Sequence, residues 1–229
     1  MREAEEAPGQ GRLRARPRTS PSGAAAEPGL RPLGLGRGRD GLVYVPVGLD
    51  PARPAPLVLA LHGAGAEGQQ MVRILSPLAD AHGLILLAPD SRGVTWDVIL
   101  DSYGPDVRLI DAALDQLFAR HAVDPARIAV SGFSDGASYA LSLGLTNGTL
   151  LTHVLAFSPG FMAPTATRDS PRFFVSHGTD DAVLPIERTS RRLVPMLEAA
   201  DYAVEYREFQ GGHTVPPDVA AAAVAWFLG

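Results

Sequence analysis

The expected fold is decided by one stretch in the middle of the chain, Val130-Ser131-Gly132-Phe133-Ser134-Asp135-Gly136. This stretch continues a short apolar run and precedes a segment whose apolar residues recur at helical spacing. A serine at a sharp turn between a strand and a helix adopts a strained backbone, and small residues two positions before and after it keep the strand and helix from colliding. An ordinary Gly-Ser loop would share the bare Gly-x-Ser-x-Gly pattern, but this context predicts a nucleophile elbow centred on Ser134.

Short apolar runs bounded by proline, glycine or charge recur on both sides of the elbow, as expected of buried strands. They are residues 42–45, 57–61, 84–88, 128–130, 154–157 and 173–175, and a further strand-like run covers residues 204–209. Helix-period segments lie between them, and the clearest covers residues 106–120 with Asp106 as its expected N-cap. The alternation predicts the α/β class, with a mostly parallel central sheet and helices on both faces. Because ligands of such sheets bind beyond the carboxyl ends of the strands, chemistry is expected in the residues that follow each run.

A serine hydroxyl needs a base to remove its proton, and a histidine base needs a carboxylate to orient it. Asp180 and Asp181 follow the apolar run at residues 173–175, and His213 lies in the glycine-rich stretch Gly211-Gly212-His213. Serine, then acid, then histidine is the order typical of α/β-hydrolases. Ser134 and His213 are therefore predicted to be catalytic, together with Asp180 or Asp181.

Acyl transfer also needs hydrogen-bond donors for the oxyanion of the tetrahedral intermediate. One is expected to be the amide of Asp135, the residue after the nucleophile. The other is expected to be the Ala64 amide, in the stretch His62-Gly63-Ala64-Gly65 after the run at residues 57–61. His62 and His177 each precede a glycine at the end of an apolar run, and both are expected to anchor loop geometry by hydrogen bonding.

Four motifs together resemble those of the small carboxylesterases of the α/β-hydrolase superfamily, in the phospholipase/carboxylesterase and acyl-protein thioesterase group. They are the oxyanion loop Leu61-His62-Gly63-Ala64-Gly65, the elbow Gly132-Phe133-Ser134-Asp135-Gly136, the acid loop His177-Gly178-x-x-Asp181-x-x-x-Pro185 and the histidine loop Gly212-His213. The resemblance covers about residues 30–229. It implies an α/β-hydrolase fold and a Ser-His-Asp triad whose acid is Asp181, and no insertion in the sequence is long enough to form a large lid domain. It also implies hydrolysis of a small-molecule carboxylic ester through an acyl-enzyme intermediate.

Two features distinguish the chain from the thioesterases of this group, because Asp135 stands where they have glutamine and a single glycine, Gly136, follows it. The stretch Ser91-Arg92-Gly93-Val94-Thr95-Trp96-Asp97 resembles feruloyl esterase-like and polyhydroxybutyrate depolymerase-like proteins instead. Thioesterase activity and activities of the latter two kinds therefore remain alternatives. A serine peptidase is less favoured, because peptidases of the superfamily usually carry an additional domain for which this chain has no room. A non-catalytic binding module is less favoured because all three members of the triad are present.

Aromatic, aliphatic and thioether side chains that follow the strands are candidates for lining a substrate pocket. They are Trp96, Ile99, Tyr103, Phe161 and Met162. The alternative is that Trp96 and Phe161 are simply core residues under a loop.

Composition excludes several other chemistries. The sequence contains no cysteine, which excludes thiol nucleophiles and thiolate metal sites. Its histidines lack the paired spacing of zinc ligands, so no metal and no other cofactor is expected. Residues 40–229 contain twelve arginines and twenty-one acidic residues, so a nucleic-acid partner is not expected. No apolar run approaches the roughly 20 residues that span a bilayer, and a cytoplasmic protein is expected.

The first 29 residues differ in composition from the rest of the chain. They are rich in arginine, proline, glycine, alanine and glutamate, contain one leucine and show no apolar periodicity. A secretory signal would need an apolar segment of roughly 7 to 15 residues, which this stretch lacks. The composition predicts a disordered leader over residues 1–29 and one α/β-hydrolase catalytic domain over residues 30–229.

Overall fold

An eight-stranded sheet forms the centre of the computed structural model, which describes residues 10–19, 27–36, 38–51, 53–100 and 102–229. The strands lie side by side in the order β1-β2-β4-β3-β5-β6-β7-β8. Strand β2 pairs antiparallel with β1 and β4, and all other neighbouring strands are parallel. The strands are β1 (Gly29–Pro32), β2 (Gly41–Val45), β3 (Ala55–Leu61), β4 (Ile85–Pro89), β5 (Val123–Phe133), β6 (His153–Phe157), β7 (Arg172–Gly178) and β8 (Val204–Phe209).

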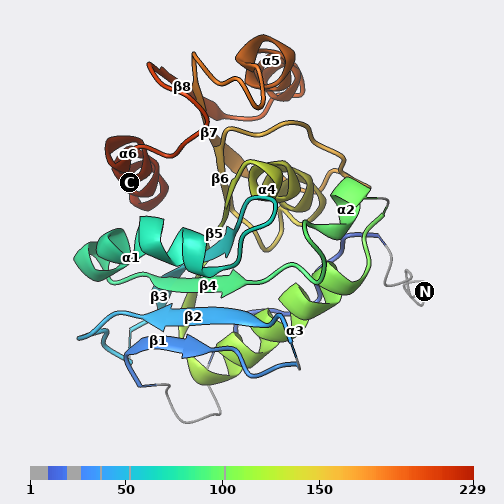
Figure 1. Cartoon of the computed structure of the whole chain (residues 1–229). Coiled ribbons are helices and arrows are strands. Elements are labelled where there is room, and N and C mark those ends of the chain that lie inside the picture. The colour runs from blue at the N-terminus through green and yellow to red at the C-terminus, as the bar shows by residue number, and fades with distance from the viewer. Residues whose placement is uncertain (1–9, 20–26, 37, 52, 101) are drawn as a thin grey trace.

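Helices cover both faces of this sheet (Figure 1). Helices α1 (Gln69–His82) and α6 (Pro217–Leu228) pack on one face, and α3 (Pro105–Arg120), α4 (Asp135–Thr146) and α5 (Ser190–Ala199) pack on the other. The short helix α2 (Asp97–Leu100) and the 3-10 helix η1 (Ile186–Arg188) lie in loops. Leu57, Leu59 and Leu61 of β3 contribute to the core on the α3 side, whereas Val58 and Ala60 contribute to the core on the α1 side. Because both faces of the sheet are covered, its central strands are continuous apolar runs in the sequence.

The predicted architecture, an α/β fold with a mostly parallel sheet, is confirmed. One detail differs, because Asp106 is not the N-cap of α3: the helix begins at Pro105, and Gly104 occupies the capping position. Asp106 is instead buried, and its carboxylate accepts hydrogen bonds from the amides of Arg92 (2.6 Å) and Asp97 (2.7 Å). The residue therefore fixes the loop that follows β4 rather than the end of its own helix.

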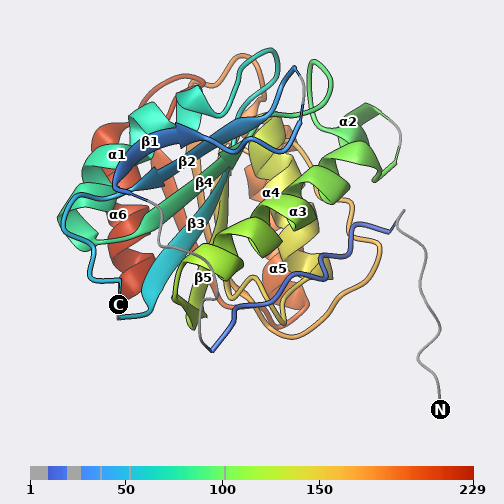
Figure 2. The same ribbon diagram turned by 90° about the horizontal axis from the view of Figure 1, so that it is seen from below.

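Residues 10–19, here called the N-terminal strap, fold onto the body and differ in this from the disordered leader expected over residues 1–29. Leu13 and Ala15 are only 2% and 7% exposed. The side chain of Asn147 accepts a hydrogen bond from Leu13 N and donates one to Gly11 O, both at 2.8 Å. Figure 2 shows the strap, in blue, beside α3 and α4. The composition hid this contact because an extended segment needs only every second side chain to be apolar. Residues 1–9 and 20–26 of the expected leader lie outside the described residues.

Among the described residues, no helix is both long enough and apolar enough to cross a bilayer.

Candidate active site

Ser134 occupies the turn between β5 and α4, in a conformation that few residues other than glycine adopt. Its φ is 57° and its ψ is −119°, and its amide donates to Phe157 O at the end of β6 (3.0 Å). A Cβ added to Gly132 would lie 2.1 Å from Gly136 O, and one added to Gly136 would lie 2.2 Å from Leu61 O. Both glycines are therefore required by close backbone contacts, as the elbow pattern predicts.

Asp181 and His213 form a hydrogen bond beyond the ends of β7 and β8. His213 Nδ1 is 2.6 Å from Asp181 Oδ2, while Asp181 Oδ1 accepts from the amides of Val183 (2.9 Å) and Leu184 (2.8 Å). Burial alone would raise the pKa of Asp181, but the hydrogen bonds from Leu184 and His213 outweigh it, so its pKa lies below the ordinary value. Asp180 is exposed and accepts a hydrogen bond from the side chain of Gln210. Of the two adjacent acids, the geometry thus connects Asp181 to the histidine.

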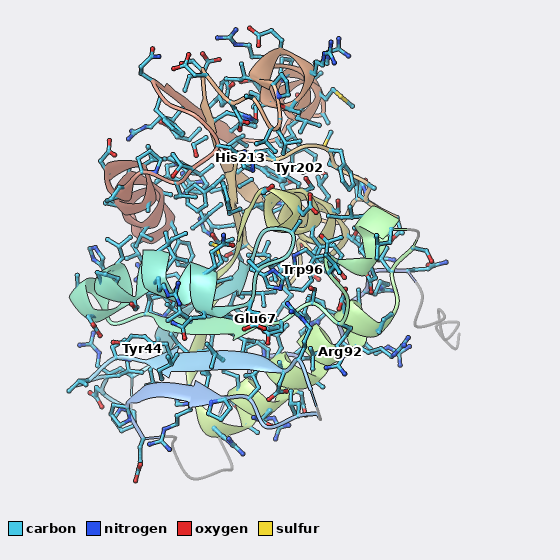
Figure 3. The ribbon with its side chains drawn as sticks, in the orientation of Figure 1. Tyr44, Glu67, Arg92, Trp96, Tyr202 and His213 are labelled. Atoms are coloured by element: carbon cyan, nitrogen blue, oxygen red, sulfur yellow. The ribbon has the colours of Figure 1, made fainter. Side chains whose placement is uncertain are left out.

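The histidine loop lies directly beside the elbow. The ring of His213 packs against the ring of Phe133, with centroids 4.7 Å apart, so His213 is next to the residue that precedes Ser134. A Cβ on Gly178 would lie 2.3 Å from Gly211 O and 2.4 Å from Gly212 O, which brings the acid loop and the histidine loop into backbone contact. Figure 3 shows His213 on the loop that leaves β8, close to α4. The predicted nucleophile, acid and base therefore lie together beyond the carboxyl ends of the parallel strands.

The loop after β3 also lies beside Ser134. A Cβ on Gly63 would lie 3.5 Å from Ser134 Cβ. The amides around Ala64 are occupied, since Gly63 N donates to Gln70 Oε1 (2.8 Å), Gly65 N to Val94 O (2.8 Å) and Ala66 N to Gly63 O (3.2 Å). No hydrogen bond within the described part of the chain engages the Ala64 amide. Asp135 is the first residue of α4, where amides have no acceptor within their own helix. Both predicted oxyanion donors are thus available to a ligand.

His62 is completely buried and supports this loop, as the sequence predicts. Its Nε2 accepts from Ser91 N (2.9 Å), and since an amide can only donate, Nδ1 carries the ring proton and lies 2.7 Å from Gly63 O. Burial lowers the pKa of His62, which keeps the ring neutral.

Two of the predicted pocket residues belong to the core instead. Trp96 is completely buried, its Nε1 donates to His62 O (2.8 Å), and its ring stacks on that of Tyr139 at 5.1 Å. Figure 3 shows Trp96 inside the molecule. Tyr103 is only 5% exposed and donates to Ala163 O (3.0 Å). Trp96 therefore supports the oxyanion loop from beneath, as its alternative interpretation has it. Ile99, Phe161 and Met162 are half-buried, and for them pocket lining stays a prediction.

Some residues around the site were not predicted. Thr95 Oγ1 donates to Asp135 Oδ2 (2.7 Å), which ties the loop after β4 to the start of α4. Val94, Leu100 and Val183 are 73%, 68% and 65% exposed, and they lie on the loops after β4 and β7. The sequence did contain a signal for Val94, Leu100 and Val183, because each is an apolar residue in a largely polar loop that follows a strand. Among the described residues, no group of three or more potential ligands is arranged to hold a metal ion.

The chain is similar in sequence to a known protein family and to individual esterases. A family model described as phospholipase/carboxylesterase matches residues 98–227. The chain is 34% identical over 157 residues to a bifunctional acetylxylan esterase/xylanase of Neocallimastix patriciarum, a match that covers 65% of this chain and 22% of that protein. It is 28% identical over 158 residues to feruloyl esterase C of Emericella nidulans, covering 66% of this chain and 57% of that protein. The chain therefore spans less than two thirds of the length of either curated relative.

A solved structure gives the corresponding likeness in three dimensions. The crystal structure of esterase PE8 matches with a TM-score of 0.67 at 24% identity, over 82% of this chain and 97% of that one. At this identity the likeness shows the fold.

Proposed function

The chain belongs to the phospholipase/carboxylesterase family of α/β-hydrolases, and from this premise we propose that it is a serine hydrolase that cleaves carboxylic esters. The observation that carries the proposal is the 2.6 Å hydrogen bond from His213 Nδ1 to Asp181 Oδ2. The imidazole ring of His213 packs against Phe133, directly before the strained turn of Ser134. The three residues come from the ends of three different strands, and their convergence is what a Ser-His-Asp triad requires.

The first half of the reaction forms an acyl-enzyme. Ser134 Oγ attacks the carbonyl carbon of the ester while His213 Nε2 takes the hydroxyl proton. Asp181 holds the Nδ1 proton and stabilises the positive charge that the ring acquires. His213 then protonates the departing alkoxide, and the acyl group remains on Ser134.

The second half reverses these roles. His213 takes a proton from a water molecule, whose oxygen attacks the acyl carbon, and the proton then passes to Ser134 Oγ as the carboxylic acid leaves. In both halves the amides of Ala64 and Asp135 donate to the oxyanion. Loss of one such donor typically costs about a hundred- to a thousandfold in kcat.

The exposed apolar residues beside the site support a substrate whose acyl group is apolar. Val94 is bonded through its carbonyl to Gly65 of the oxyanion loop, and Val183 lies two residues after Asp181. With Leu100 they form what we call the apolar rim, which offers contact area to an aliphatic or aryl acyl group near the reacting carbonyl. Because a feruloyl esterase is among the curated relatives, an ester of an aromatic acid is the second candidate substrate class.

A substrate panel separates these possibilities. p-Nitrophenyl esters of rising acyl length, ethyl ferulate, an acyl thioester and a peptide anilide should be compared by kcat/KM. We expect esters of longer aliphatic acids or of aromatic acids to have a higher kcat/KM than the acetyl ester. The anilide should have the lowest kcat/KM of the panel. A preference for the thioester or the anilide would replace the esterase assignment.

The cytoplasmic location stays a prediction from the sequence.

Covalent labelling tests the nucleophile itself. A fluorophosphonate probe should modify wild-type protein on Ser134, as read by peptide mass spectrometry, and Ser134→Ala should abolish the modification. Ser131→Ala is the matched control, because Ser131 Oγ is buried and makes no hydrogen bond within the described residues. Absence of labelling in the wild type, or labelling that survives Ser134→Ala, would falsify the proposed function.

A further inference from the structure

The carboxylate of Asp181 has a second histidine neighbour besides His213. His177 lies near the end of β7 and is completely buried. Its Nε2 is 3.2 Å from Asp181 Oδ2, the same oxygen that pairs with His213 Nδ1 at 2.6 Å. The sequence predicted for His177 only a role in anchoring its loop. The contact with Asp181 places it next to the proposed triad.

The hydrogen bonds of His177 identify which ring nitrogen carries the proton. Nε2 is also 2.8 Å from Leu184 O, and a carbonyl oxygen can only accept, so Nε2 must carry a hydrogen. That hydrogen points to Leu184 O, and Asp181 Oδ2 lies beside it as a second, more distant acceptor, 3.2 Å from Nε2. On the other side of the ring, Nδ1 is 2.7 Å from the hydroxyl of Ser190, which is completely buried at the start of α5. In the neutral ring Nδ1 is an acceptor, so the Ser190 hydroxyl donates to it. Burial lowers the pKa of His177, which favours this neutral form.

We propose that His177, held by Ser190, is a positioning residue of the active site that fixes Oδ2 of Asp181 and shares that oxygen with His213. This inference rests on the proposed function. Asp181 then has a donor on every side: two backbone amides at Oδ1 and two imidazoles at Oδ2. Such a carboxylate cannot rotate without losing hydrogen bonds. Because two donors draw on Oδ2, it is a weaker acceptor for His213 than it would be with one.

Charged groups around His177 come from two loops, a strand and a helix. Asp181 and His213 lie on the acid and histidine loops, and Glu208 of β8 is the register partner of His177. Glu208 is itself paired with Arg191 of α5, with an Nη2 to Oε2 distance of 2.6 Å, and this guanidinium lowers the pKa of Glu208. Glu208 therefore remains ionised in mild acid, and it adds no second step to the acid limb of a rate profile.

The pair His177→Asn and His177→Gln isolates the Nε2 donor. A glutamine amide reaches about as far as Nε2 and can still donate to Leu184 O and Asp181 Oδ2, whereas an asparagine amide reaches only the level of Nδ1. Loss of the donor makes Oδ2 a stronger acceptor for His213 Nδ1, which stabilises the positively charged ring in the variant. We expect His177→Asn to raise the midpoint of the acid limb by about half a pH unit, and to lower the plateau rate about tenfold, as loss of one hydrogen bond to a charged group allows.

The measurement is the pH dependence of the fluorophosphonate labelling rate at Ser134. His177→Gln should restore the wild-type profile, and Ser190→Ala should shift it in the same direction as His177→Asn but by less. His153→Asn is the control, because His153 is another buried histidine, at the opposite end of the sheet. It should leave the profile unchanged. If His177→Asn does not fold, as judged by circular dichroism, Ser190→Ala carries the test because it retains the ring.

Proton NMR gives a second readout that a purely structural role would not move. Wild-type protein should show downfield imidazole protons from both His213 Nδ1 and His177 Nε2, and His177→Asn should remove one and shift the other. A wild type that labels normally, with His177→Asn and Ser190→Ala profiles and the His213 resonance unchanged, would overturn the inference alone. A wild type that does not label would overturn the proposed function first.

Discussion

The two oxygens of Asp181 have different partners, and this asymmetry predicts what a single-atom change would do. In Asp181→Asn, the amide oxygen would take the place of Oδ1, because that position receives the Val183 and Leu184 amides. The side-chain NH2 would then face His213 Nδ1 and force the ring to carry its proton on Nε2, where it could not accept from Ser134. We expect kcat to fall about 10⁴-fold, the loss typical of a triad whose carboxylate becomes an amide.

The adjacent acid provides a matched control for that measurement. Asp180→Asn makes the same chemical change at an exposed site whose partner is Gln210. Its kcat with a p-nitrophenyl ester should stay within about twofold of wild type, since substitutions at exposed sites have small effects. Equal losses in the two variants would contradict the assignment of Asp181 as the acid.

Asp181 also links stability to pH. Its pKa in the folded protein lies below the ordinary value, because hydrogen bonds from Leu184 and His213 outweigh burial. Its ionisation therefore stabilises the fold above the unfolded-state pKa of about 3.9, and this contribution is lost as pH falls through the lower folded-state value. The difference in unfolding free energy between wild type and Asp181→Asn should thus shrink between about pH 6 and about pH 3. Urea unfolding at both pH values would measure it, and a difference that grows in acid would contradict the assigned direction.

At the scale of elements, β3, β5 and α4 meet at the elbow with no room for a further methyl group. In Gly136→Ala the new Cβ would lie 2.2 Å from Leu61 O and 2.5 Å from His62 O, both backbone atoms of the oxyanion loop. We expect a loss of about 1–3 kcal/mol in unfolding free energy, as for other overpacked sites, together with a fall in kcat because the loop must move.

Gly93→Ala is the control for the elbow, because its Cβ would meet the nearest atom, Thr95 O, at an ordinary 3.5 Å. Thermal unfolding and ester turnover should change little in this variant. If Gly136→Ala matched it in both, the close packing at the elbow would not be what requires glycine there.

The elements show where sequence reasoning succeeds and where it stops. Strands β3, β5 and β8 could be predicted because burial on both faces, or position before a glycine-rich loop, leaves a local trace in the chain. Trp96 could be placed after β4 but not assigned to the core, because its burial depends on His62 and Tyr139, which are far away in sequence. His177 was similar, since its contacts with Asp181 and Ser190 exist only once the acid loop has folded back.

At the scale of the whole molecule, the sequence predicted the class of fold and the end of the sheet at which the candidate site residues lie. It could not supply the strand order, in which β4 lies between β2 and β3, because pairing between distant segments has no local pattern. Nor did it reveal the N-terminal strap. Four arginines surround Leu13 and Ala15 in that stretch, and the two apolar residues become significant only through contacts with α3 and with Asn147 at the end of α4.

The strap extends the folded unit toward the N-terminus, and its contacts should contribute to stability. Deletion of residues 1–19 would expose the site of Leu13, leave the Asn147 side chain without two hydrogen bonds, and uncover the ring of Tyr103, which packs against Gly11. Burial of a leucine alone is worth about 1.5–3 kcal/mol, so we expect at least that loss in unfolding free energy. Deletion of residues 1–9 is the matched control and should leave the melting temperature unchanged, because it spares all of these contacts.

The strap should also affect the substrate side of the molecule. Tyr103 donates to Ala163 O, directly after the candidate pocket residues Phe161 and Met162, so loosening of Tyr103 is transmitted to that loop. We expect the deletion of residues 1–19 to raise KM for long acyl esters more than for the acetyl ester. The kcat for the acetyl ester should be preserved, because the contacts of the strap recorded among the described residues reach Tyr103, α3, Asn147 and Thr165 rather than the triad or the oxyanion loop. Equal melting temperatures for the two deletions would mean that the strap adds nothing to the fold, and equal changes in KM across the ester series would separate it from the pocket.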